Sequence, residues 1–155
     1  HKALASKPIR NPMELWHLIA RESIRDLVAR YNANGDTGRF AQVRELFSPT
    51  ATMVINPGGT FTGIEEVMTI FTGTADSTSV ASGLTHVRHS TTTHQIDLID
   101  EAHATGRLYF FVLTDIGLDH WGRYVDHYEV IDGVWKFSSR NVTVDGWATN
   151  SLFPH

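Results

Sequence analysis

The segment from residue 120 to 144, HWGRYVDHYEVIDGVWKFSSRNVTV, holds two stretches rich in β-branched and aromatic residues on either side of Asp132-Gly133. An Asp-Gly pair between two such stretches is typical of a tight β-hairpin, because both turn residues must tolerate positive φ. The flanking stretches predict strands over His120–Ile131 and Val134–Val144. This hairpin predicts the antiparallel character of the sheet around it.

Two more strands are predicted upstream, over Leu84–Ile99 and His103–Asp115. The first half of the chain has helical periodicity instead. Helices first and an antiparallel meander after them are typical of the α+β class. We therefore expect a cone-shaped α+β barrel, with three N-terminal helices packed on a curved, mostly antiparallel sheet.

The first expected helix begins near Pro12 and ends at Asn34-Gly35, and its apolar residues recur at three- and four-residue steps. A second, shorter helix carries the apolar residues from Phe40 to Phe47 and ends at Ser48-Pro49. A short strand is expected over Ala51–Ile55.

The capping box Thr62-Gly63-Ile64-Glu65 predicts the start of a third helix. The segment Gly73–Gly83 is rich in Thr, Ser, Ala and Gly, and predicts a mobile loop.

A length of 155 residues fits one domain, with residues 1–11 as an N-terminal extension and 146–155 as a C-terminal tail. The net charge is −4 and no Lys/Arg cluster is present, which argues against nucleic acid as a partner. No apolar run approaches the roughly 20 residues of a membrane span, and residues 1–11 lack a signal-peptide core. No membrane association is expected, and the cytoplasm is the expected location.

The strand expected after the loop is polar on both faces. One face would carry His86, Arg88 and His94, and the other Val87 and His89. Such a strand is either a solvated edge or the wall of a polar cavity, and its length favours the cavity, since a long exposed edge invites mispairing. On the strand His120–Ile131, Tyr124 shares a face with Gly122, Asp126 and Tyr128, which suits either a pocket wall or the edge of the core.

Nine histidines make a metal site a fair question, and six of them lie between His86 and His127. Only His86 and His94 share a strand face, and no chelating spacing such as His-Glu-x-x-His occurs. Cysteine is absent, as are a serine-nucleophile motif and a Gly-rich phosphate loop. We expect neither a metal nor an organic cofactor.

Several motifs resemble the SnoaL-like (nuclear transport factor 2-like) superfamily, and the likeness runs from about residue 13 to 145. They are Arg30-Tyr31-Asn32-Ala33-Asn34-Gly35-Asp36, Leu46-Phe47-Ser48-Pro49-Thr50-Ala51, Thr62-Gly63-Ile64-Glu65, Thr85-His86, Gly122-Arg123-Tyr124-Val125-Asp126 and the run from Asp132 to Asn141. The superfamily includes dehydratases, cyclases, isomerases, a dehydrochlorinase, oxygenase small subunits and binding proteins.

The resemblance implies four catalytic candidates. Scytalone dehydratase, bile-acid dehydratase and hexachlorocyclohexane dehydrochlorinase use an aspartate that matches Asp36 and a histidine that matches His86. An arginine of the dehydrochlorinase matches Arg140, and a tyrosine of bile-acid dehydratase matches Tyr31. An aspartate bonded to one imidazole nitrogen leaves the other free to accept a proton, while a phenol and a guanidinium can stabilise developing negative charge.

Each of these residues also has a structural interpretation. Asp36 can cap the second helix, His86 can be a buried and satisfied histidine, and Arg140 can pair with Asp26, Asp126 or Asp145. Whether His89, His94 or His120 share the site stays open at this stage.

The function expected is that of a cofactor-independent, dehydratase-like lyase acting on a mostly apolar cyclic or aromatic molecule. The alternatives are an isomerase or cyclase with the same base, a ligand-binding module, and an oxygenase small subunit. A homodimer or homotrimer is expected, formed through the outer sheet face. The expected substrate-binding residues are Phe40, Tyr109, Thr114, Trp121 and Tyr124.

Overall fold

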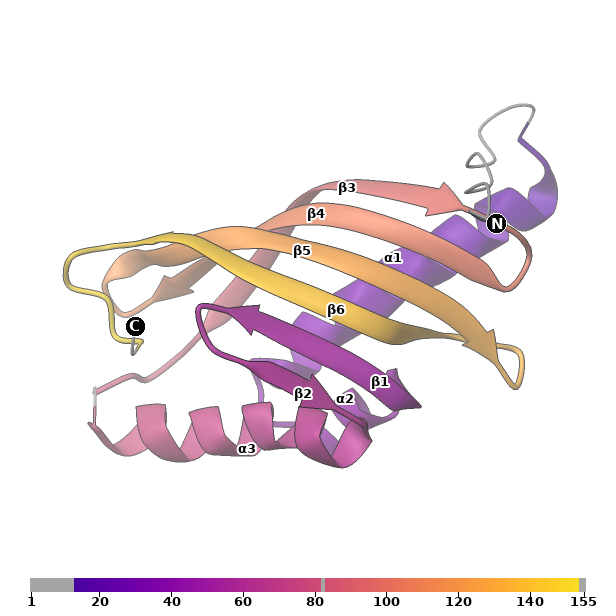
Figure 1. Ribbon diagram of the computed structural model, residues 1–155. Coiled ribbons are helices and arrows are strands. Elements are labelled where there is room, and N and C mark those ends of the chain that lie inside the picture. Colours follow the sequence, from indigo (N-terminus) through magenta and orange to yellow (C-terminus); the bar gives the residue numbers. More distant parts are fainter. Residues whose placement is uncertain (1–12, 82, 154–155) are drawn as a thin grey trace, which may run out of the picture.

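Six strands form one curved sheet in the computed structural model, which describes residues 13–81 and 83–153 (Figure 1). Their order is β2-β1-β6-β5-β4-β3, and every neighbouring pair is antiparallel except β1 with β6. The α+β class and the curved, mostly antiparallel sheet are therefore confirmed. The sheet is open and not closed into a barrel, with β2 and β3 at its two edges.

The elements follow the order expected of the chain, with helices mostly in the first half and the long strands in the second. The Asp132-Gly133 hairpin is confirmed, and both residues have positive φ, 50° and 79°. The helices are α1 (Leu15–Gly35), α2 (Phe40–Arg44) and α3 (Ile64–Ala81), and the strands are β1 (Phe47–Asn56), β2 (Thr60–Thr62), β3 (Arg88–Leu98), β4 (His103–Thr114), β5 (Gly117–Ile131) and β6 (Val134–Trp147).

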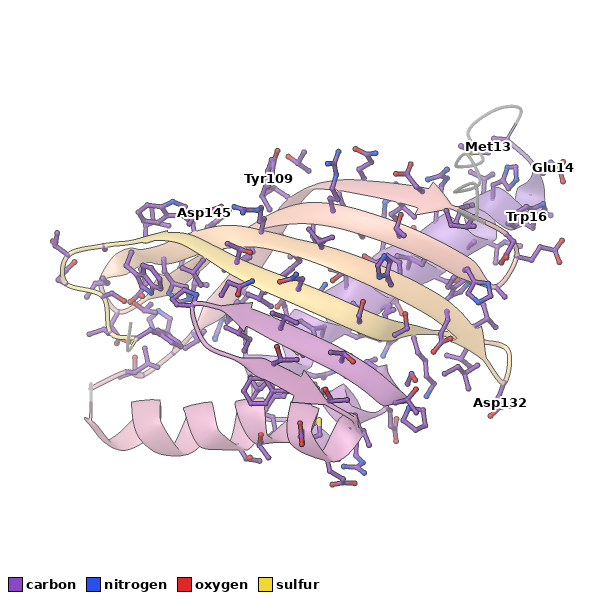
Figure 2. The ribbon with its side chains drawn as sticks, viewed as in Figure 1. Met13, Glu14, Trp16, Tyr109, Asp132 and Asp145 are labelled. Atoms are coloured by element: carbon purple, nitrogen blue, oxygen red, sulfur yellow. The ribbon has the colours of Figure 1, made fainter. Side chains whose placement is uncertain are left out.

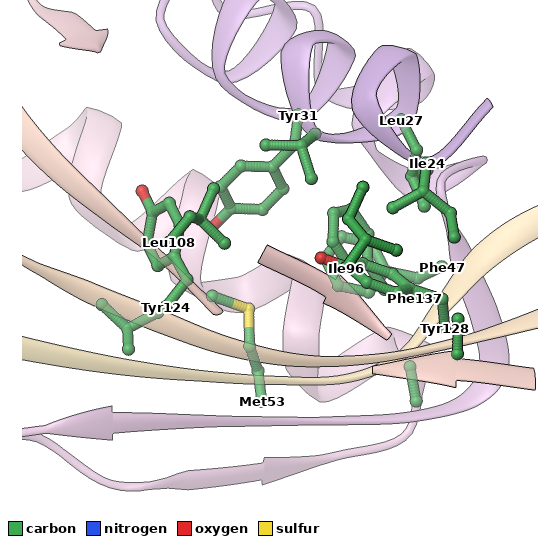
Figure 3. Packing of buried hydrophobic residues seen from close by; sticks show 14 of the residues in the cluster. Ile24, Leu27, Tyr31, Phe47, Met53, Ile96, Leu108, Tyr124, Tyr128 and Phe137 are labelled. Carbon is green, nitrogen blue, oxygen red and sulfur yellow. The ribbon is translucent and has the colours of Figure 1, made fainter. Parts of the chain in front are cut away.

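Helix α1 supplies one wall of the core. It begins at a capping box in which the Glu14 backbone N–H donates to His17 Nδ1 (2.9 Å), while Pro12 lies outside the described residues. Its apolar stripe, from Ala20 through Ile24 to Tyr31, is buried against the inner face of the sheet. Figure 3 shows Tyr31 reaching from α1 toward Tyr124 on the sheet. No helix in the described residues is long and apolar enough to cross a membrane.

Two local expectations are wrong. The second helix ends at Arg44, and β1 already begins at Phe47. Pro49 is tolerated inside β1 because the register shifts between Phe47 and Thr52, so no ladder hydrogen bond is needed at the proline. The segment expected to be a loop from Gly73 is helical as far as Ala81. Relative to alanine, each Ser or Thr disfavours a helix by about 0.5 kcal/mol, which is too little to end a helix that has already started.

A buried polar network crosses the sheet below α1. Arg140 on β6 and Asp126 on β5 are fully buried and joined by two hydrogen bonds of 2.8 Å, from Nε and Nη2. Tyr128 donates to the same carboxylate (2.7 Å), and His94 Nε2 lies 3.1 Å from the Tyr128 hydroxyl. Gly106 permits this approach, because a Cβ there would lie 2.5 Å from the Tyr128 hydroxyl oxygen.

This network makes His94 a source of acid sensitivity. Burial lowers the pKa of His94 from 6.5 to about 4, helped by the positive charges of Arg140 and Arg25 and opposed by Asp126. Because the unfolded chain binds a proton at His94 near pH 6.5 and the folded chain only near pH 4, stability is lost as the pH falls through this window.

In the wild type, the free energy of unfolding should fall as the pH is lowered from 7.5 to 5. In His94→Gln this fall should be smaller by about 1 kcal/mol, a figure that allows for the partial exposure of the ring. Urea denaturation at the two pH values measures this difference. His127→Gln, on the exposed side of β5, is the matched control and should behave as the wild type. Equal pH dependence in all three proteins would contradict the assignment.

Candidate functional site

A cavity of about 550 Å³ lies between the inner face of the sheet, the end of α1, and α3. We call it the central cavity. Its walls are largely apolar, which suits a ligand with a hydrophobic body. The aromatic lining consists of Tyr31, Phe40, Phe71, Phe110, Tyr124 and Phe153. The polar lining consists of Asn32, Asp36, Thr85, His86, His89 and His120.

Asp36 and His89 form a closely bonded pair in this cavity. Asp36 Oδ1 lies 2.5 Å from His89 Nδ1, and Oδ2 accepts a hydrogen bond from the His89 backbone N–H (2.8 Å). Asp36 is the residue that ends α1, and His89 is the second residue of β3. The two contacts therefore join the end of the helix to the start of the strand and fix the plane of the imidazole.

The expected pairing of Asp36 with His86 is wrong, and so is the expectation that Asp36 caps the second helix. The expected pairing came from the resemblance, and the structure has His86 before the start of β3 and His89 inside the strand. β3 also contains a β-bulge, in which Thr93, at φ 50°, and His94 together face the single residue Leu108. The alternation of strand faces changes there, so His94 and Ile96 point inward after the bulge, whereas His89 points inward before it. The strand pattern alone had left open which of the two faces lines a cavity, and His86 was chosen from the resemblance.

His86 lies at the rim of the central cavity, just before β3. Its side chain is 44% exposed, and Nδ1 lies 3.9 Å from Asp115 Oδ1 and 3.1 Å from the Thr85 hydroxyl. Asp115 is held by the Thr85 backbone N–H (2.9 Å) and hydroxyl. His86 is therefore neither buried nor bonded to Asp36.

A second His–Asp pair lies at the cavity, with His120 in the lining and Asp119 behind it. From the sequence, the role of His120 stayed open and no pairing with Asp119 was expected. His120 Nδ1 lies 2.8 Å from Asp119 Oδ1, and both residues are buried. Val112 pairs with His120 and Leu113 with Leu118, so Asp119 is the additional residue of a bulge in β5. This bulge turns two consecutive side chains away from solvent, which strict alternation does not predict.

The floor of the cavity is built from stacked aromatic rings. Phe110 and Tyr124 stack with centroids 4.6 Å apart. Gly122 permits this packing, because a Cβ there would lie 2.9 Å from the Phe110 ring and 2.0 Å from the Thr143 carbonyl oxygen. Burial raises the pKa of Tyr31 and of Tyr124, so both phenols stay protonated and can donate hydrogen bonds.

The structure places Tyr31, Asp36, Phe40, His86 and Tyr124 at the cavity, as expected from the sequence. Three other expected binding residues lie elsewhere. Tyr109 is 57% exposed on the outer face of the sheet, where Figure 2 shows it pointing away from the strands. Trp121 comes directly after His120 on β5, so its side chain projects from the outer face of the sheet. Thr114 is buried but donates to Asp119 Oδ2 (3.0 Å) and does not line the cavity.

Arg140 is also absent from the cavity lining. Of its three possible partners it bonds Asp126, while Asp26 and Asp145 pair with Arg30 and Arg123. Its guanidinium carbon lies 3.9 Å from the Tyr124 ring centroid and 4.2 Å from that of Tyr31. Arg140 thus supports two rings of the cavity floor from behind. The expectation that Arg140 contacts the substrate is therefore wrong.

No group of three or more His, Asp or Glu side chains is arranged to hold a metal ion in the part of the chain that the structure describes. Each cavity histidine is instead near one carboxylate of its own: His86 near Asp115, His89 beside Asp36 and His120 beside Asp119. Such pairs orient imidazole rings for proton transfer.

An open curved sheet covered by one long helix, with a cavity at the helix end, defines the cystatin-like or nuclear transport factor 2-like class of α+β proteins. Residues 16–141 match the SnoaL-like domain family. The chain belongs to this family. No curated protein sequence matches the chain.

Solved structures similar to this chain include a putative scytalone dehydratase from Novosphingobium aromaticivorans, with TM-score 0.77, 18% identity, and 88% and 91% of the two chains covered. The LinA-type3 hexachlorocyclohexane dehydrochlorinase from Novosphingobium barchaimii has TM-score 0.74 and 19% identity, covering 92% of this chain and 100% of that one. A cystatin-like protein of unknown function from Nostoc punctiforme has TM-score 0.72 and 22% identity, covering 82% and 92%. At these identities the likeness establishes the fold.

The burial of the Arg140–Asp126 pair gives a prediction about stability. Arg140→Met should lower the free energy of unfolding by about 3–5 kcal/mol, because it leaves Asp126 charged and buried without its partner. Replacing both residues, as Arg140→Met with Asp126→Leu, should recover part of the loss. Denaturant unfolding of the single and double variants measures this. An unchanged stability in Arg140→Met would contradict a structural role for the pair.

Proposed function

We propose that the protein is a cofactor-independent, dehydratase-like lyase whose base is His89, oriented by Asp36. The observation that carries the proposal is the double contact of Asp36 with His89 inside a cavity with aromatic walls. The substrate is a mostly apolar cyclic or aromatic molecule, because the lining contributes several aromatic rings and few charged groups. His89 takes the role that the sequence alone assigned to His86.

The arrangement suits removal of a proton next to a carbonyl group. Asp36 accepts from Nδ1–H of His89, which leaves the Nε2 lone pair available as a base. His89 Nε2 takes the proton, the C–H electron pair forms the new double bond, and the leaving group departs with its own bonding pair. Asp36 then stabilises the imidazolium that has formed.

Two phenols can assist at the substrate oxygen. Tyr31 and Tyr124 both line the cavity, and their rings lie 6.0 Å apart, centroid to centroid. The Tyr124 hydroxyl donates to Asn32 Oδ1 over 3.4 Å, a long bond that a substrate carbonyl can replace. A protonated phenol aimed at a developing enolate oxygen stabilises the transition state more than the ground state.

We expect His89→Ala to lower turnover by about 10²- to 10⁴-fold, the usual contribution of a general base. Asp36→Asn should also cost a large factor, because an amide can hold the wrong tautomer and cannot stabilise the imidazolium. A panel of β-hydroxy ketones, followed by the absorbance of the conjugated product, measures the rates. A chelator should leave them unchanged.

His86→Ala is the matched control, since His86 lies at the rim of the same cavity without contact to Asp36. It should cost far less than His89→Ala. The reverse order would contradict the assignment of the base. Binding of the panel without turnover would favour a ligand-binding module, and a rearranged product without loss of water would favour an isomerase.

We also expect a homo-oligomer formed through the outer sheet face. Phe111 pairs with Trp121 and Leu113 with Leu118 across β4 and β5, and these side chains form an apolar strip on that face. A second copy burying the strip would remove it from water. Light scattering should give the mass of a dimer or trimer, and Leu118→Glu should shift it to the monomer. A monomeric wild type at micromolar concentration would contradict this.

A further inference from the structure

His120 and Asp119 form a pair whose chemistry the base mechanism does not use. His120 lines the central cavity and Asp119 lies behind it, fully buried. The contact between His120 Nδ1 and Asp119 Oδ1 (2.8 Å) has the same form as the contact between His89 and Asp36. In both pairs the carboxylate contacts Nδ1, so Nε2 is the nitrogen on the opposite side of the ring from the carboxylate.

The surroundings of Asp119 keep it ionised. Its carboxylate accepts from the Ser151 hydroxyl (2.6 Å), the Leu152 backbone N–H (2.9 Å) and the Thr114 hydroxyl (3.0 Å), besides His120. Burial alone would raise the pKa of Asp119, but these hydrogen bonds together outweigh it and lower the pKa. The other three donors are neutral, so the imidazole is the one of the four that can carry a compensating positive charge.

The two imidazoles border one substrate position. His89 on β3 and His120 on β5 both pair with Val112 on β4, so they stand in one row across the inner face of the sheet. Their ring centroids are 6.3 Å apart. The Phe110 ring lies 6.2 Å from His89 and 6.4 Å from His120, forming the floor below both.

The C-terminal segment holds the second ring in place from the other side. The Phe153 ring lies 4.7 Å from the His120 ring, and Ser151 and Leu152 anchor this segment to Asp119. The two imidazoles and the Phe110 ring therefore border the same part of the cavity, with Phe153 beside the second imidazole.

We propose that His120, positioned by Asp119, is the general acid of the elimination for which His89 is the base, and that the substrate is a β-hydroxy carbonyl compound. This inference rests on the proposed function. Hydroxide is a poor leaving group and departs readily only when a proton is delivered to its oxygen, whereas halide needs no such proton. A second oriented imidazole is therefore useful for loss of water and superfluous for loss of halide.

The step balances as follows. His89 Nε2 takes the proton from the carbon next to the carbonyl, and the C–H pair becomes the C=C bond. The C–O bond breaks with its electron pair on oxygen, and that oxygen receives the proton from His120 Nε2, so that water leaves. His89 ends protonated and His120 neutral, and one proton exchanged with solvent at each ring restores the starting state.

Two probes with one carbon skeleton test the role of His120. They are 4-hydroxy-4-phenylbutan-2-one, whose leaving group needs a proton, and its 4-nitrophenyl ether, whose phenolate leaves without one. His120→Gln should lower elimination from the alcohol by about 10²- to 10³-fold and from the ether by less than about 3-fold. His89→Gln should lower both, because both reactions need the base.

The matched control is His127→Gln, which removes a histidine from the outer side of the same strand and should leave both rates unchanged. Asp119→Asn should follow the pattern of His120→Gln, since Asp119 acts only through the ring. Thermal melting of every variant identifies loss of fold. Equal loss on both probes in a folded His120→Gln, or no loss on either, would overturn the inference.

A binding measurement separates failure of this inference from failure of the proposed function. 4-Nitrophenol, whose absorbance near 400 nm reports its ionisation, should bind as the phenolate and more weakly in His120→Gln by about 10-fold, with His127→Gln unchanged. If the wild type eliminates neither probe, the proposed function fails, and this measurement alone decides whether His120 donates to a cavity oxygen. Phenolate binding that depends on His89 and not on His120 would overturn the inference.

Discussion

A fully buried ion pair, Arg140 with Asp126, is the constraint around which the rest of the molecule is arranged. Two charges removed from water need both good geometry and further partners. The sheet supplies the geometry, because the two residues stand opposite each other on β5 and β6. Tyr128 completes the carboxylate, and the rings of Tyr31, Tyr124 and Phe137 surround the guanidinium. Through the Tyr31 ring, the pair also contacts α1.

The floor of the central cavity follows from this constraint. Tyr31 and Tyr124 line the cavity with one side of their rings and contact the Arg140 guanidinium with the other. A ligand would therefore touch the two rings but not Arg140. Burying the cation behind aromatic rings keeps the cavity low in fixed charge. Such a space favours apolar ligands and strengthens the few polar interactions made inside it.

The chemistry of the site comes from two irregularities in an otherwise regular sheet. One bulge places Thr93 and His94 opposite Leu108, which leaves His89 facing inward, and the other adds Asp119 before His120. The bulge in β5 adjoins the cavity through His120, whereas His94 in the bulge of β3 lies away from it, in a pocket with Arg21 and Arg25. Both bulges re-aim polar side chains that a regular strand would send to solvent. The SnoaL-like scaffold supplies the cavity, and these local departures supply its histidines. Fold membership alone therefore leaves the reaction to be argued from the site.

The sequence alone determined the class of the fold, the four long strands and the Asp132-Gly133 hairpin, because period-two alternation and turn chemistry are local properties of the chain. It also placed Tyr31, Asp36 and Tyr124 at the cavity. Only the tertiary structure decided that Asp36 binds His89, that Arg140 lies behind the cavity, that Tyr109 and Trp121 point outward and that α3 continues to Ala81. For the side chains of the sheet the physical reason is register: a bulge depends on how two strands pair, and one added residue exchanges the inner and outer faces of everything beyond it. For α3 the reason is cooperativity, since weak local preferences do not end a helix that has already started.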